Sequence, residues 1–67
     1  MGLYVHGKIL GVETKGKPDK LFNIIHVLEG FEKSEVITNK PVEFKKDDAV
    51  QIAVRPYKDK LYRVDVQ

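Results

Sequence analysis

The sequence predicts an all-β fold, a small five-stranded barrel that occupies the whole chain as one domain, residues 1–67. Apolar and polar side chains alternate with a period of two in several segments, as they do in strands with one buried face. Gly, Pro and charged residues separate these segments, and no segment has convincing helical periodicity. Five strands in so short a chain must close on themselves or leave long unpaired edges, so we expect closure.

The first strand is predicted over residues 3–14, where Leu3 and Val5 begin the apolar face. Gly7 and Gly11 interrupt the alternation, and a glycine within a strand usually marks a bulge or a sharp bend. The segment is also longer than the roughly 3–10 residues of most strands. A long strand that bends and pairs on both sides is what a small barrel needs, so these glycines favour a barrel over an open sheet.

Two hairpins are expected next. Gly and Pro make residues 15–20 a turn. Residues 21–28 form the second strand, since their β-branched content and flanking turns outweigh an apolar spacing that would also suit a helix. Residues 29–33 are predicted to be a hairpin tip, and residues 34–38 a short third strand.

The pattern breaks at residues 39–41, and a brief extended piece (42–44) and a polar turn (45–48) follow. The last two strands are predicted over residues 49–55 and 61–66, joined by a turn over 56–60. Matching the apolar triplets predicts inward pairs Val54 with Tyr62, Ile52 with Val64, and Val50 with Val66. The outward pairs are then Arg55 with Leu61, Ala53 with Arg63, and Gln51 with Asp65. In this register Arg55 and Arg63 share an outer face, and a one-residue slip would expose one triplet.

A coiled first strand, then a pair of hairpin-linked strands, then a final hairpin is the order of a Greek-key barrel of the OB type. An SH3-like barrel is the alternative, because its five strands produce a similar pattern along the chain.

The composition argues against an enzyme. There is no cysteine for a disulfide or thiolate site, and neither His6, His26 nor Ser34 lies in a catalytic motif. Two histidines fall short of the three or four ligands of most metal sites, so we expect no catalytic residue, no metal and no cofactor. The chain lacks both a signal peptide and an apolar run of about 20 residues, which predicts a cytoplasmic protein without a membrane partner.

The charge is distributed unevenly. Residues 15–20 carry a net charge of +2 and residues 55–63 a net +3, within a chain whose total is only +2. Aromatic residues accompany these cations, a pairing that suits unpaired nucleic acid, because cations follow the backbone while rings stack on bases. Phe22 is as readily a core residue, whereas Phe31 at a hairpin tip is hard to explain as core. The candidate nucleic-acid-binding residues are Lys15, Lys17, Lys20, Phe22, Phe31, Lys33, Arg55, Tyr57, Lys60 and Arg63.

The layout resembles the small single-stranded-DNA-binding proteins of phages and mobile elements, such as the filamentous-phage helix-destabilising protein. The resemblance lies in the turns and alternation of residues 7–11, 15–18, 42–52 and 60–66. It implies an OB barrel, a homodimer, a role in DNA replication, and cooperative coating of single strands with little sequence preference. The chain is shorter than the filamentous-phage type, and residues 29–35 carry three acids where that family binds phosphate.

The leading hypothesis is therefore a single-stranded-DNA-binding protein, with RNA as a weaker option. The alternative is a small protein-interaction module, either an SH3-like adaptor or a phage inhibitor of a host protein. That alternative predicts exposed aromatics gathered away from the basic turns.

Overall fold

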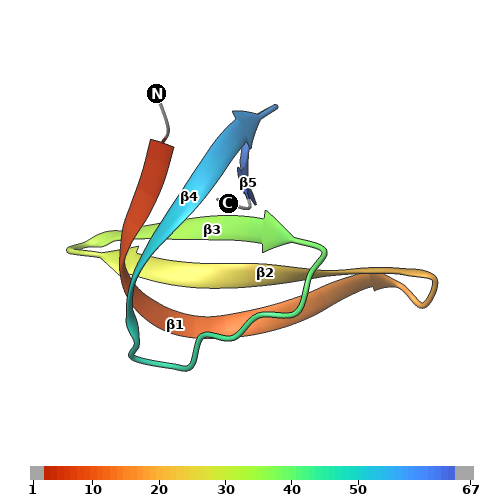
Figure 1. Cartoon of the computed structure of the whole chain (residues 1–67), viewed down its shortest axis with the longest axis horizontal. Coiled ribbons are helices and arrows are strands. Elements are labelled where there is room, and N and C mark those ends of the chain that lie inside the picture. The colour runs from red at the N-terminus through yellow and green to blue at the C-terminus, as the bar shows by residue number, and fades with distance from the viewer. Residues whose placement is uncertain (1–2, 65–67) are drawn as a thin grey trace.

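The computed structural model describes residues 3–64 and confirms the all-β prediction (Figure 1). The strands are β1 (Leu3–Lys17), β2 (Lys20–Glu29), β3 (Glu32–Thr38), β4 (Ala49–Tyr57) and β5 (Lys60–Arg63). Residues 42–44, predicted as a brief extended piece outside the five strands, lie in the irregular connection between β3 and β4. Among the described residues no helix is long and apolar enough to cross a membrane.

The five strands close into a barrel in the order β1-β2-β3-β5-β4. Three strands follow one another by hairpins, and β4 then returns to lie beside β1, which is the Greek-key arrangement. A simple meander would have placed β4 beside β3. Instead β5 lies between them and runs parallel to β3 through two pairs, Val36 with Leu61 and Ile37 with Tyr62. The chain is thus a small OB-like barrel.

The first strand serves both sides of the barrel, as its glycines predict. Its first half pairs with β4 and its second half with β2, and the register shifts by one residue between Ile9 and Gly11. Gly7 has a φ of +151°, and a Cβ built on it would lie 2.2 Å from the carbonyl oxygen of Leu28. The backbones of β1 and β2 therefore approach each other at a point where only glycine fits.

The core is small and aliphatic. Its buried members come from four strands: Val5, Ile9, Ile25, Val27, Val36, Ile52 and Val54. Partly buried side chains from the β3–β4 connection and from β4 and β5 complete it, namely Val42, Phe44, Val50 and Leu61. The inward set Val50, Ile52 and Val54 is thereby confirmed.

The predicted register of the final hairpin is wrong by one residue. Tyr57 pairs with Lys60, Arg55 with Tyr62, and Val54 with Arg63. The cause is a two-residue turn whose central residues, Lys58 and Asp59, have φ values of 47° and 58°. Positive φ at both positions defines the tight type I′ turn that fixes hairpin register.

This shift reverses the side chains of β5. Tyr62 was expected in the core but lies on the outer face with 37% of its surface exposed. Arg63 lies across from the inward Val54, so it does not share a face with Arg55. The predicted partners Asp65 and Val66 lie outside the described residues.

Two hairpins extend the barrel in opposite directions. The β1–β2 tip and the β2–β3 tip lie at the two ends of the longest axis, right and left in Figure 1. The Cα atoms span 34 Å along that axis. Any surface that involves both tips must therefore run the length of the molecule.

Candidate nucleic-acid interface

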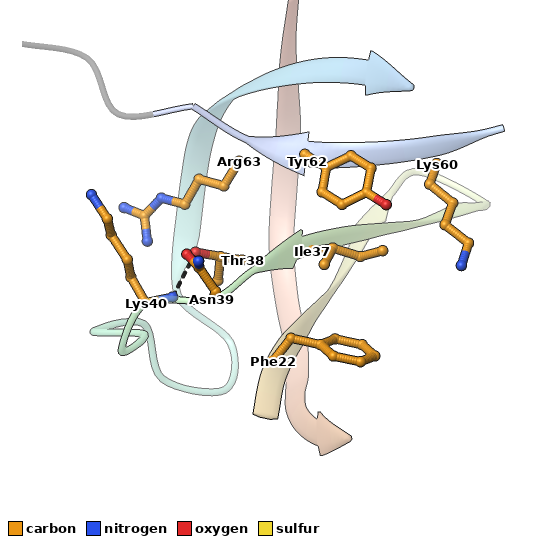
Figure 2. Close-up of a pocket in the computed structure, with 8 residues that line it drawn as sticks. All are labelled: Phe22, Ile37, Thr38, Asn39, Lys40, Lys60, Tyr62 and Arg63. Carbon is orange, nitrogen blue, oxygen red and sulfur yellow. Dashed lines mark hydrogen bonds between the residues drawn. The ribbon is translucent and has the colours of Figure 1, made fainter. Parts of the chain in front are cut away.

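An open groove runs across the outer face of β2, β3 and β5. Successive residues of a strand face opposite ways, so Phe22 and Ile24 point outward while Ile25 joins the core. Ile37 pairs with Ile24 on one side and with Tyr62 on the other. Figure 2 shows the rings of Phe22 and Tyr62 on either side of Ile37, supplied by three neighbouring strands. Two depressions share Phe22, Ile37 and Lys60, so the groove is continuous.

Cations line this groove. Lys15 lies directly across from Phe22 in the β1–β2 ladder, and Lys60 lies on β5 beside the ring of Tyr62. The lining contains five cations and two carboxylates. It therefore carries a net +3, although the entire chain carries only +2. These residues are Lys15, Lys33, Lys40, Lys60 and Arg63, with Glu35 and Asp59.

The aromatic surface continues from Tyr62 onto the β4–β5 hairpin. The rings of Tyr57 and Tyr62 meet edge to face with centroids 6.2 Å apart. The Nζ atom of Lys58 lies 5.5 Å from the Tyr57 centroid. Arg55 pairs with Tyr62 and lines a shallow depression with both tyrosines. Three exposed or half-buried rings, those of Phe22, Tyr62 and Tyr57, thus follow one another among cations.

Arg63 lines one end of the groove but is already engaged by its own chain. Its Nη2 atom donates to Oε1 of Glu43 at 2.7 Å, and its guanidinium lies 4.9 Å from the centroid of Phe44. The hydrogen bond from Arg63, together with the attraction between the two charges, holds the pKa of Glu43 below its usual value. Arg63 therefore ties β5 to the β3–β4 connection, and its charge is largely compensated.

The structure brings together seven of the ten residues predicted from sequence, although not in the predicted way. Lys15, Phe22, Lys33, Lys60 and Arg63 line the groove, and Arg55 and Tyr57 adjoin it. Lys17 and Lys20 lie beyond the groove, at the tip of the β1–β2 hairpin. Phe31 is fully exposed at the opposite tip, as its position in a turn predicts.

Several groove residues were missed, Tyr62 and Ile37 among them. Tyr62 was assigned to the core because the two-residue turn at Lys58 and Asp59 was not recognised. Ile37 sits between the buried Val36 and Thr38 on a strand whose neighbours the sequence does not specify. Recognition of the turn would have recovered Tyr62, whereas Ile37 has no local signal.

His26 joins two acids near the groove without forming a metal site. Its Nε2 atom lies 3.2 Å from Oε1 of Glu13, and its Nδ1 atom lies 3.8 Å from Oε2 of Glu35. The acids approach opposite ring nitrogens, so the three groups do not converge on one point. Over residues 3–64 no group of three or more His, Cys, Asp or Glu side chains is arranged to hold a metal ion.

Comparisons of the chain with protein-family models, with characterised proteins and with solved structures found no match. The functional inference therefore depends on the strand order and on the chemistry of the groove.

Proposed function

We propose that this chain binds single-stranded DNA, with little sequence preference, along the groove over β2, β3 and β5. The observation that supports this best is the pair of rings, Phe22 and Tyr62, set on either side of Ile37 on a surface with Lys15 and Lys60 at its edge. Flat apolar rings among cations match the two parts of an unpaired strand, its base faces and its phosphates.

The proposal fits a single strand better than a duplex. Stacking on an aromatic side chain contributes about 1–3 kcal/mol per base and is available only where bases are unpaired. Every base has a π-face, which explains the expected lack of sequence preference. The outer face of strands 2 and 3 is also where OB barrels accommodate oligonucleotides.

A protein-interaction module remains the second candidate, and it predicts aromatics away from the cations. Phe31 fits that description, since it lies at a hairpin tip between acids. Phe22, Tyr57 and Tyr62 do not, because each lies beside a lysine or an arginine. The groove therefore favours nucleic acid, and the Phe31 tip calls for a separate explanation.

The direct test is a fluorescence anisotropy titration of the protein with a short oligo-dT at about 50 and 200 mM salt. We expect saturable binding that weakens with salt. If Lys15, Lys33 and Lys60 each neutralise one phosphate, the log–log slope should be about −2, from roughly −0.7 per contact on a single strand. Absence of saturable binding at low salt, or binding indifferent to salt, would refute the proposal. Oligo-rU in parallel reports any preference for RNA.

Ring removal tests the site itself. Phe22→Ala and Tyr62→Ala should each weaken oligo-dT binding by about tenfold or more, since each removes a stacking platform. Tyr62→Phe keeps the ring and should bind like wild type. Phe31→Ala is the matched control, because Phe31 is exposed but lies outside the groove. Equal losses for Phe31→Ala and Tyr62→Ala would contradict the assigned site. Thermal unfolding of each variant separates lost binding from lost folding.

A further inference from the structure

The two hairpin tips at the ends of the long axis carry opposite chemistry. At the β2–β3 tip Glu29 pairs directly with Glu32, and the Phe31 side chain between them is 105% exposed. At the β1–β2 tip Lys17 pairs directly with Lys20. The adjoining Leu21 is 54% exposed, and it lies opposite Gly16, which has no side chain to cover it. Each tip thus presents an apolar side chain beside a like-charged pair.

Each of these pairs places two like charges face to face. Like charges directly opposite each other on neighbouring strands reduce stability. Among residues 3–64, none of the side chains of Lys17, Lys20, Glu29 and Glu32 forms an ion pair. An external partner of opposite charge would relieve the repulsion at either tip.

We propose that the acidic Phe31 tip of one molecule docks on the basic Leu21 tip of a second copy. Phe31 would pack against Leu21 while Glu29 and Glu32 approach Lys17 and Lys20. Because the two tips lie at opposite ends of the long axis, the contact is heterologous and extends into an open row of molecules (Figure 1). The row would form along a bound strand, a step that rests on the proposed function.

The contact between tips and the binding of DNA in the groove use different residues, so both can occur in one molecule. The groove is lined by Lys15, Lys33 and Lys60, whereas Lys17 and Lys20 lie beyond it. A stable complex buries roughly 800 Å² per partner. We expect a contact between two hairpin tips to bury much less, so free molecules should associate only weakly. Neighbours on one strand have a high effective concentration, and there the contact becomes significant. The contact therefore appears as cooperativity on long DNA.

Charge reversal tests this contact through two variants, each of which disables one tip. The acid-to-base variant carries Glu29→Lys and Glu32→Lys, and the base-to-acid variant carries Lys17→Glu and Lys20→Glu. On long oligo-dT the cooperativity of each variant alone should fall by about tenfold or more. An equimolar mixture should recover it, because the reversed tips match each other and so do the unreversed ones. Cooperativity unchanged in the single variants, or not restored in the mixture, would overturn the proposal.

A second measurement needs no DNA and so separates this inference from the proposed function. The ¹⁵N-labelled acid-to-base variant is titrated with the unlabelled base-to-acid variant at low salt. Both tips of each variant meet an oppositely charged tip of the other, so chemical-shift changes are expected at residues 17–21 and at residues 29–32, whichever variant carries the label. Absence of these changes contradicts the contact even if oligo-dT binds. Their presence supports the contact even if the short oligo-dT titration fails and the groove assignment falls.

The apolar part of the contact has its own control. Phe31→Ser should lower cooperativity on long oligo-dT and leave affinity for a short oligonucleotide unchanged. Leu10→Ser also removes an exposed apolar side chain, 38% exposed and away from both tips, and should change neither. Equal effects from the two substitutions would show that Phe31 has no special part in the contact.

Discussion

The β1–β2 and β2–β3 hairpins are alike in turn length and opposite in surface charge. Each closes over a two-residue turn, and each ends in a pair of like charges, Lys17 with Lys20 in one and Glu29 with Glu32 in the other. They share strand β2, and their tips lie at opposite ends of the long axis (Figure 1). A barrel this small therefore presents two different surface chemistries at its two ends. The difference depends on side chains and not on a change of fold.

The largest effect is expected where β1 approaches β2 at the base of the acidic hairpin. In Gly7→Ala the added Cβ would lie 2.2 Å from the carbonyl oxygen of Leu28, the β2 residue just before the acidic tip. We expect a loss of about 3 kcal/mol in the free energy of unfolding, measured by urea denaturation. Gly11→Ala is the matched control, because nothing lies within 4 Å of its Cβ position. A similar loss in both variants would mean that the close approach at Gly7 is not what constrains the junction.

The next prediction compares a lysine in the groove with a lysine at the basic tip. Lys60→Gln should reduce the magnitude of the salt slope of oligo-dT binding by about 0.7, as expected for one lost phosphate contact on a single strand. Lys17→Gln removes the same charge beyond the groove and should leave the slope for a short oligonucleotide nearly unchanged. If the two substitutions change the slope equally, phosphates reach the tip and the division between groove and tip is wrong.

The like-charged pairs themselves should each reduce stability slightly. Glu32→Lys and Lys20→Glu each convert a repulsive cross-strand pair into an attractive one, and each should stabilise the fold by roughly 0.2–1 kcal/mol. Differential scanning calorimetry at low salt would show this as a small rise in Tm that fades at high salt. A fall in Tm for either substitution would mean that its like-charged pair does not reduce stability. It would also weaken the proposal that the two tips bind each other in neighbouring molecules.

An effect of similar size is expected at Arg63, whose charge is paired with Glu43 and is not available to the groove or to either tip. Glu43→Gln removes the partner of Arg63 and should cost about 0.2–1 kcal/mol at neutral pH, the usual range for an exposed ion pair. The pKa of Glu43 is lowered in the folded state, so the stabilisation is complete above its ordinary value of 4.5 and disappears as pH falls through the lowered value. Urea denaturation of both proteins from pH 7 to 3 should show the difference vanish in acid. A difference that persists in acid would contradict the pairing.

Much of the fold follows from local patterns. Alternation located β2, β3 and β4 to within two residues, Gly7 and Gly11 indicated the bend in β1, and the tip at Phe31 was placed correctly. The final hairpin was misaligned because Lys58 and Asp59 are not the Asn-Gly or Asp-Gly pair that usually signals a type I′ turn. A slip of one residue then moved Tyr62 to the wrong face.

The sequence by itself determined the all-β class, the hairpins and the charges at their tips, because alternation and turn composition act between residues close in the chain. Only the tertiary structure decided which side chains form the groove. Phe22, Ile37 and Tyr62 become neighbours through antiparallel pairing of β2 with β3 and parallel pairing of β3 with β5. The parallel pairs join residues 25 positions apart, as Val36 and Leu61 are, and no local pattern encodes such a partner. The tips were visible in the chain, but their placement at opposite ends of the molecule was not.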